Sequence, residues 1–505
     1  MKKIFYKILV ITSLIVVSCG DNDANIVIDN PPVNEGTEII EFSFLKSNNP
    51  SLLFDINLTI DGNVITGSVS YEVNIKDLIA TFEHDGLEVI VGNSKQISGT
   101  THNDFSKKII YSVRTSDQRR EDYEIVVSYY TGLPIFYINT NGVPIDSKDE
   151  YREGYASIFG GLNFDNLQNT EMKIRGRGNS TWGVHDKKPY QLKFNEQTKV
   201  LGIPKDRKWL FLAEHSDKTL LRNKIAFEMG YLSNLDWTPK SEYAEVFLNN
   251  EYNGTYHISQ KVEESNQRVV LGDTGYLLEI DQLYRLDDDD VYFYTNNFLI
   301  CIKEPEVAEN SSEYDYIKNL IIDFEANLYS SQFTNPTTGY ASFIDVDSFV
   351  DWYLINEITK NVDARWFSSI FLNVIPGEKI KMGPLWDFDL AFGNVDYADS
   401  QYWDGFWIKQ NPWYGRLFED PAFVEKVKQR FSYFRDNQNF ILDKIDFYAN
   451  YLSLAQEEND IKWDIIGNYA WPNPVVYDTY EEEVAHLKNW YVQRMNWLAN
   501  AFNNL

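Results

Sequence analysis

The sequence predicts a multidomain protein in which an all-β module precedes a larger part of mixed α and β structure. At 505 residues the chain is longer than one hydrophobic core usually supports, so two or more domains are expected. Strand-like alternation dominates residues 38–131, whereas helical and strand-like patterns mix over residues 133–505. The content of 43% hydrophobic and 15% aromatic residues is sufficient for packed cores and argues against disorder.

The N-terminus, residues 1–19, has the pattern of a bacterial export signal. Early lysines precede an apolar stretch, Ile8–Val17, that is short for a membrane span. The run Val-Val-Ser-Cys resembles a lipobox, which implies lipidation of Cys19; an ordinary signal peptide with an incidental cysteine is the alternative. Residues 20–37 are acidic and contain a Pro pair, which is typical of a flexible tether.

These features predict a lipoprotein of the cell envelope that a lipid anchors to the outer membrane. Acidic residues just after Cys19 resemble the surface-export signal of Bacteroidota lipoproteins, so periplasmic and outward-facing locations both stay open. After lipidation only Cys301 remains as a free thiol, which excludes an intrachain disulfide. The net charge of −29 argues against a nucleic-acid partner, because phosphate backbones require a basic face.

The segment 38–131 is predicted to form a β-sandwich. Ile56, Leu58 and Ile60 alternate on one face, and the Asp61-Gly62 pair predicts a hairpin turn. No catalytic constellation occurs in this part of the sequence. It resembles the small immunoglobulin-like modules that precede enzymatic domains in Bacteroidota lipoproteins, which implies a spacer or adhesion role.

A glycine-rich, cationic turn begins the chemically interesting part of the chain. Two glycines free the backbone beside Arg175, Arg177 and Asn179, and a strand-like run that carries Lys193 follows. Such a turn can bind an anionic group such as phosphate through backbone N–H groups and charge. A structural tight turn is the alternative.

Residues 216–232 have a helical pattern with a carboxylate inside its apolar stripe. Leu221, Glu228 and Leu232 fall within a narrow arc of one helix face. A buried carboxylate needs a partner, and Lys193 on the preceding strand is the natural candidate. The pair would position a nucleotide phosphate; an ion pair that only satisfies burial is the alternative.

A second predicted helix, residues 346 to about 360, is amphipathic in pattern and leads to Asn361-Val-Asp363. An Asp that follows a helix end can orient or deprotonate a hydroxyl group, although it can also simply cap a turn. Further along, the run Gly383-Pro-Leu-Trp-Asp-Phe-Asp-Leu-Ala-Phe-Gly393 places two carboxylates two residues apart in an apolar context. If this run is a strand, Asp387 and Asp389 share one side and call for a divalent cation.

Seven motifs in this order resemble those of the spore coat protein H (CotH) kinase family: RGNSTW, KKPY, LFLAEHSDKTLLRNKIAFEMG, EVFLNNEYNGTYHISQKVE, GYLLEID, WYLINEITKNVD and MGPLWDFDLAFGN. The resemblance covers roughly residues 133 to 430. It implies an atypical, secreted, two-lobed kinase-like fold that binds ATP with Mg²⁺ or Mn²⁺ and phosphorylates protein Ser/Thr hydroxyls.

By position, the resemblance implies that Asp363 is the catalytic aspartate and that Asp387 binds metal; Asp389 is added from the expected strand geometry. Arg175, Asn179, Lys193 and Glu228 are assigned to ATP from the local patterns and their place in these motifs. One departure concerns Ser368, which stands where general protein kinases carry a metal-binding Asn, so the second metal site stays open.

Two other function classes remain open. An adhesion or glycan-binding lipoprotein can keep the kinase-like fold without turnover, a hypothesis that the β-rich module and the 13 Trp motivate. A glycosidase is the third hypothesis, but two carboxylates at i and i+2 of one strand face lie too close to flank a scissile bond. The helical pattern of residues 400–505 indicates packing on the C-terminal lobe.

Overall fold

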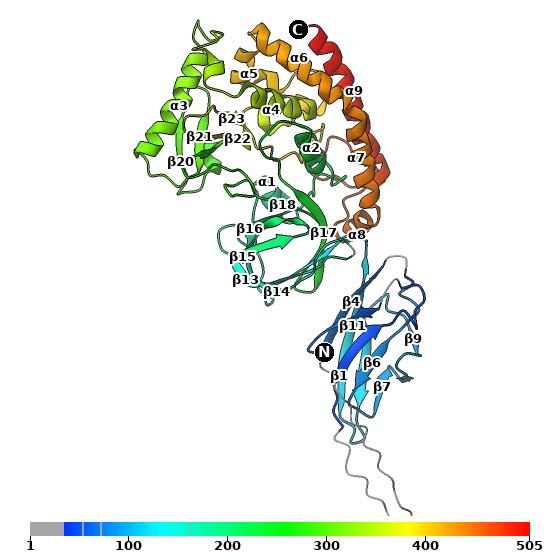
Figure 1. The fold of residues 1–505 in the computed structure, drawn as a ribbon. Helices are drawn as coiled ribbons and strands as arrows, with labels where there is room; N and C mark the ends of the chain where they lie inside the picture. Colours follow the sequence, from blue (N-terminus) through cyan, green and yellow to red (C-terminus); the bar gives the residue numbers. More distant parts are fainter. Residues whose placement is uncertain (1–34, 53–54, 71–72, 162) are drawn as a thin grey trace, which may run out of the picture. The chain divides into compact units, whose positions relative to one another are not determined.

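A computed structural model describes residues 35–52, 55–70, 73–161 and 163–505 (Figure 1). The export signal, Cys19 and most of the expected tether lie outside these residues. The chain divides into two compact units, Met1–Tyr129 and Tyr130–Leu505, and each is treated by itself.

The first unit is all-β. Its larger sheets have the strand orders β2-β1-β6 and β3-β4-β11-β10-β7-β8, and a two-stranded sheet pairs β5 with β9. The hairpin expected at Asp61-Gly62 is confirmed, because β3 pairs antiparallel with β4 across it. Phe42, Phe44 and Tyr111 belong to one core that draws on both larger sheets. The strands are β1 (Ile39–Phe44), β2 (Ile56–Asn57), β3 (Thr59–Asp61), β4 (Val64–Ser70), β5 (Leu78–Ile79), β6 (Thr81–His84), β7 (Glu88–Val91), β8 (Ser94–Gln96), β9 (His102–Asn103), β10 (Ile109–Arg114) and β11 (Arg120–Tyr130).

The second unit begins with a closed barrel of strand order β12-β13-β14-β15-β16-β18-β17, which the parallel pairing of β12 with β17 closes. Ile174, Leu192 and Trp209 belong to one buried cluster inside the barrel. Register shifts interrupt the regular pairing of β13 with β14, of β15 with β16 and of β17 with β18. The barrel strands are β12 (Ile135–Asn139), β13 (Arg152–Phe159), β14 (Leu167–Gly176), β15 (Tyr190–Val200), β16 (Ile203–Leu212), β17 (Ser241–Leu248) and β18 (Glu251–Gln260).

A second sheet and most of the helices follow the barrel in sequence (Figure 1). The sheet has the order β20-β21-β19-β22-β23, formed by β19 (Tyr276–Ile280), β20 (Val291–Tyr294), β21 (Leu299–Glu304), β22 (Ile370–Val374) and β23 (Lys381–Met382). The helices of the unit are α1 (Ser180–Val184), α2 (Arg222–Tyr231), α3 (Ser312–Leu328), α4 (Val346–Thr359), α5 (Pro412–Leu417), α6 (Pro421–Asp436), α7 (Gln438–Tyr451), α8 (Ser453–Trp463) and α9 (Tyr480–Asn503), with short 3-10 turns η1 (Leu283–Arg285), η2 (Tyr340–Ser342), η3 (Asp363–Arg365), η4 (Asp399–Gln401) and η5 (Ile408–Gln410).

The helix expected from residue 346 is confirmed as α4, but the expected amphipathic character is wrong. Every residue of α4 from Ser348 to Thr359 is buried. The polar side chains that suggested an exposed face are paired inside the protein: Glu357 binds Arg494 of α9, and Asp351 binds Arg430 of α6. Helix α4 is therefore a central element of the core, and it fixes where the chain after it begins.

Candidate active site

The structure brings together three aspartates that the sequence separates by up to 26 residues. Asp363 opens the turn η3 directly after α4, and Asp387 and Asp389 lie in the loop that follows β23. Burial, then the charge of Asp387, raises the pKa of Asp363 to about 7. Burial, then Asp387 and Asp363, raise the pKa of Asp389 well above its usual range. The mutual effects show that the three carboxylates share one charged centre.

The strand expected for the Asp387–Asp389 run is wrong, because this segment is a loop. Asp387 has a φ of +67°, in the left-handed region that non-glycine residues rarely adopt. The peptide bond that follows Asp387 is held at both ends: Asn361 donates to the carbonyl of Asp387 at 3.0 Å, and the N–H of Phe388 donates to Asn223 at 2.8 Å. Two asparagines from different elements thus support the unusual backbone conformation.

Hydroxyl groups complete the immediate surroundings of the carboxylates. Ser369 donates to Asp387 at 3.2 Å, and Ser368 approaches Asp363 at 3.5 Å. Ser368 is the residue that stands in place of the metal-binding Asn of general protein kinases. It contacts the catalytic candidate Asp363 itself, at the long end of hydrogen-bond distance.

The donor chemistry of this centre fits a hard divalent cation. Among the described residues no group of three or more His, Cys, Asp or Glu lies close enough to enclose a metal ion. Mg²⁺, however, is commonly bound by one or two carboxylates with the remaining ligands from substrate phosphates and water. Asp387 and Asp389 supply such a pair, and burial together with the neighbouring carboxylates raises the pKa of Asp389 well above its usual range.

Arg177 is the cation that faces these aspartates, and the sequence analysis did not select it. Asp387, Asp389 and Glu214 act on its charge, and its guanidinium lies 5.6 Å from the ring centre of Trp386. Arg177 follows β14, where residues 173 and 175 point outward from the barrel. The same alternation, continued by two residues, predicts that Arg177 also points outward, and this was the signal in the sequence that could have selected it.

The two residues selected from the same turn lie elsewhere. The guanidinium of Arg175 lies 4.9 Å from the ring centre of Tyr151, and Asn179 is exposed and accepts a hydrogen bond from Lys148 at 3.3 Å. Neither contact reaches the aspartates. Any role of these two residues with a nucleotide therefore depends on a ligand that extends over the outer face of the barrel.

Lys193 belongs to a row of three lysines on that outer face. The strand register places Lys173, Lys193 and Lys208 directly opposite one another on β14, β15 and β16. Burial, then Lys208 and Lys173, lower the pKa of Lys193. Leu210 and Leu212 share this face of β16 and pack in one cluster with Trp386. The lysine row thus lies on the side of the barrel that meets the aspartate loop.

The expected Lys193–Glu228 pair is wrong. Glu228 forms an ion pair with Lys444 of α7 at 3.0 Å and accepts a hydrogen bond from Tyr448 at 2.6 Å. Both partners lie more than 200 residues later in the chain, so no local pattern can indicate them. Glu228 joins α2 to α7 and lies away from the aspartate centre.

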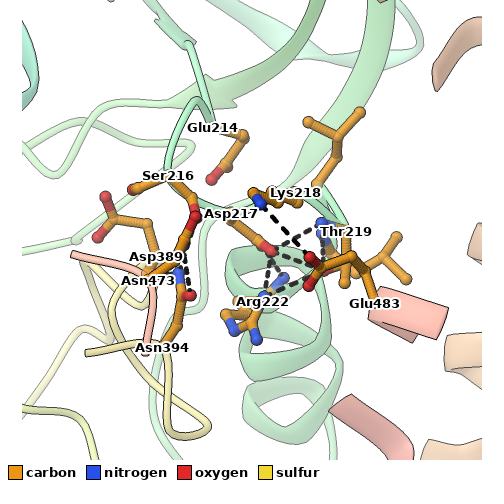
Figure 2. Close-up of polar contacts among 12 residues, drawn as sticks. Glu214, Ser216, Asp217, Lys218, Thr219, Arg222, Asp389, Asn394, Asn473 and Glu483 are labelled. Carbon is orange, nitrogen blue, oxygen red and sulfur yellow. Dashed lines mark hydrogen bonds and ion pairs between the residues drawn. The ribbon is translucent and has the colours of Figure 1, made fainter. Parts of the chain in front are cut away.

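A second group of polar side chains lies before and at the start of α2, next to Asp389 and Asn394 of the aspartate loop (Figure 2). Buried Glu214 accepts from Asn223 at 3.1 Å and contacts His257 of β18 at 3.0 Å. Since Asn223 also holds the backbone of Phe388, this chain of contacts connects the barrel to the loop. Burial, then Asp217 and Asp389, raise the pKa of Glu214 well above its usual range, which favours a neutral carboxyl group.

The same region contains ion pairs that secure the first turn of α2. Arg222 binds Asp217 and donates to the carbonyl of Ala391 at 3.1 Å, and Lys218 pairs with Glu483 of α9 (Figure 2). Asn394 donates to the carbonyls of Ser216 and Asp389. The aspartate loop is therefore held at several points along its length.

The model of the family described as CotH kinase protein matches residues 174–498, well over half of the chain. The chain belongs to the CotH kinase family. The matched region contains four of the seven barrel strands, β15 to β18, together with the second sheet and the helices up to most of α9. It includes the candidate residues from Arg175 to Asp389 described above. The CotH kinase match supports a kinase-like protein, and a search of curated proteins finds no match.

Two solved structures are similar to parts of the chain. A candidate secreted protein from Bacteroides fragilis is 15% identical over 20% of this chain and 100% of its own, with a TM-score of 0.16. A candidate glycoside hydrolase from Bacteroides thetaiotaomicron is 11% identical over 57% of this chain and 88% of its own, with a TM-score of 0.19. Scores this low carry no argument about function. None of the helices in the described part of the chain has the length and apolar character that a membrane-spanning helix requires.

Proposed function

We propose that this CotH kinase family member transfers the γ-phosphoryl group of ATP to a protein Ser or Thr hydroxyl, with Mg²⁺ or Mn²⁺. The observation that carries the proposal is the shared charged centre of Asp363, Asp387 and Asp389, which Arg177 faces. Phosphoryl transfer depends mainly on positioning and on neutralising phosphate charge, and this centre offers both cation ligands and a fixed guanidinium.

The residues divide the work by position. Asp387 and Asp389 would hold the divalent cation, which supplies positive charge for the phosphate oxygens. Asp363, beside them, orients the acceptor hydroxyl and accepts its proton; a carboxyl whose pKa lies near 7 is suited to that exchange at neutral pH. The new O–P bond forms at the acceptor oxygen while the bond between the γ-phosphorus and the bridging oxygen breaks, which leaves ADP.

Cations of the barrel would bind the remaining phosphates. Arg177 lies nearest the aspartates, and Lys193 continues the positive charge along the same outer face. Arg175 and Asn179 stay proposed nucleotide contacts at the edge of that face, whereas the ion pair of Glu228 with Lys444 favours a structural role. A two-lobed kinase-like arrangement would place the nucleotide between the barrel and the aspartates.

Location remains part of the proposal. The lipobox-like sequence at Cys19 supports a lipid-anchored protein of the cell envelope, facing the periplasm or the outside, and the first unit would serve as its spacer. A kinase-like binding protein without turnover is the second candidate, which the scarcity of ATP outside the cytoplasm favours.

Incorporation of labelled phosphate from ATP tests the proposal. The protein without residues 1–19 is incubated with a generic protein acceptor and Mg²⁺ or Mn²⁺, beside Asp363→Ala and Asp387→Ala. We expect labelling by the wild type that both variants lose. Absence of labelling by folded wild-type protein with both cations would overturn the kinase and leave the binding protein.

A further inference from the structure

A pocket of about 270 Å³ lies beside the candidate catalytic aspartate. Trp366, three residues after Asp363, forms part of its wall, and so does Asp281, whose charge acts on Asp363. Pockets for drug-sized ligands typically have volumes of roughly 300–1,000 Å³, so this one suits a smaller group, about one ring in size. The pocket therefore adjoins the surroundings of Asp363 through Asp281 and Trp366.

The wall of the pocket is rich in neutral hydrogen-bonding groups. Gln282, Thr295, Asn296 and Asn297 line it together with Asp281. Side-chain amides donate and accept at once, as sugar hydroxyl groups do. Within the described residues, the amide of Asn296 has no hydrogen-bond partner of its own and is exposed, so it is available to a ligand.

The charge balance of the pocket favours a neutral occupant. Asp281 already forms an ion pair with Arg285 at 2.9 Å. A basic side chain would have to compete with this guanidinium, and an anion would meet the carboxylate. An aliphatic side chain would offer no hydrogen bond to the amide of Asn296.

An aromatic side chain provides the second requirement of a sugar site. The indole of Trp366 is 44% exposed and lines the pocket, and the guanidinium of Arg365 lies 3.5 Å from its ring centre. Tyr294, 57% exposed, stands at the same pocket. Arg365 covers one face of the indole, so the exposed remainder of Trp366 and the ring of Tyr294 offer the apolar surface on which the C–H face of a pyranose can pack.

Buried contacts hold the pocket in shape. Glu325 of α3, 1% exposed, accepts from Thr295 at 3.1 Å, from the backbone of Asn296 at 2.7 Å and from the side chain of Asn297 at 2.8 Å. On the other wall, Gln282 donates to the carbonyl of Phe367 at 2.9 Å, next to Trp366. Because the buried carboxylate of Glu325 accepts three hydrogen bonds from this surface loop, it holds the loop in one conformation.

We propose that this pocket binds one neutral pyranose unit. The acceptor polypeptide would carry this sugar as a glycan near the reacting hydroxyl. The acceptor role rests on the function proposed above, whereas sugar binding by the pocket does not. The pyranose packs against Trp366 and exchanges hydrogen bonds with Asn296 and its neighbours.

Saturation-transfer NMR with methyl glycosides of glucose, galactose, mannose and N-acetylglucosamine tests binding without ATP. We expect saturation of the ring protons of at least one glycoside by the wild type. Trp366→Ala should weaken this transfer about five- to tenfold, the usual size of an aromatic contact. Asn296→Ala, on an exposed loop, should weaken it as well. Tyr284→Ala is the matched control, because Tyr284 is 76% exposed and lies outside the pocket wall.

Absence of transfer to all four glycosides would overturn the proposal, as would equal transfer in the wild type and both pocket variants. Displacement of a bound glycoside by an unglycosylated Ser-containing peptide would also overturn it, since the pocket would then belong to a polypeptide. The ATP labelling assay is read separately: sugar binding without labelling would remove only the kinase, and labelling without sugar binding would remove only this pocket.

Discussion

The two units of the chain differ in how far their charged side chains are buried. In the first unit the ion pair of Arg120 with Asp122 is representative, with side chains 47% and 49% exposed. In the second unit both side chains of the Arg494–Glu357 pair are fully buried, and Asp363, Asp389 and Glu214 have pKa values raised by burial. Burying charge costs free energy, so its concentration in one unit indicates where positioning of polar groups matters to function.

The largest expected effect separates the units by activity. Asp387→Asn removes a charge from the proposed cation site and should lower phosphoryl transfer by about 10³- to 10⁴-fold, near the upper range for single catalytic groups. Asp122→Asn, in the first unit, should leave the rate unchanged. Initial rates of labelled-phosphate transfer measure both, and a rate for Asp387→Asn within tenfold of wild type would break the comparison.

The next effect concerns stability. Arg494→Met leaves Glu357 buried without its partner, and we expect a loss of about 3–5 kcal/mol in the free energy of unfolding. Arg120→Met, at an exposed pair, should cost less than about 1 kcal/mol. All 13 Trp lie beyond residue 181, so Trp fluorescence during urea unfolding reports on the second unit, and far-UV circular dichroism follows both. Similar losses in both variants would contradict the contrast.

A smaller effect depends on pH. Because the native pKa of Asp363 is raised to about 7, the native state keeps a proton that the unfolded chain releases near pH 4. Stability from this group is therefore fully present below about pH 4 and falls as pH rises to 7. Asp363→Asn should unfold like the wild type at pH 4 and be more stable at pH 8, by at most about 4 kcal/mol.

Asp387 and Asp281 face Asp363 with negative charge and Arg285 with positive charge, while Ser368 contacts it as a neutral hydroxyl group. Since Mn²⁺ at Asp387 would offset the repulsion, added Mn²⁺ should narrow the difference between wild type and Asp363→Asn at pH 8. Chemical denaturation at both pH values measures the effect. If Asp363→Asn is no more stable than the wild type at pH 8, the surroundings of Asp363 do not disfavour its charged form.

The smallest effect is on alignment of the cation site. Asn223→Ala removes the acceptor for the N–H of Phe388 but neither carboxylate, so phosphoryl transfer should fall about tenfold. The concentration of Mn²⁺ required for half-maximal rate should rise with it, which a purely structural loss would not produce. Asn63→Ala, in the first unit, is the matched control, and an unchanged Mn²⁺ requirement in Asn223→Ala would remove the positioning role.

Local patterns predicted the parts of the fold that local forces determine. Alternation and the Asp61-Gly62 turn were enough for the β3–β4 hairpin, and periodicity was enough for α4. For the segment 216–232 it predicted a helix, but the helix α2 covers only Arg222–Tyr231. The amphipathic character of α4 was wrong because its polar residues find partners on α6 and α9, far away in sequence. Helix propensity is local, but the burial of a helix face depends on what the rest of the chain places against it.

The candidate site shows the same limit. Asp363 and the Asp387–Asp389 pair are visible in the sequence as carboxylates in apolar surroundings, and the structure brings them together. The loop conformation of Asp387 is not visible, since it depends on Asn223 and Asn361 from two other elements. Likewise Lys193 lies beside Lys208 through strand register, which no spacing in the sequence reveals.

The two hydrogen bonds that hold the peptide bond after Asp387 make the position of this carboxylate depend on two helices. One end is held from α2 and the other from the segment after α4, so the carboxylate is aimed only while both helices keep their places. Both hydrogen bonds are needed at the same time. Displacement of either helix by more than a hydrogen-bond length would break one of them and free Asp387 to leave its unfavourable backbone conformation at φ +67°. A displacement of α2 and a displacement of α4 can therefore each misalign the same aspartate.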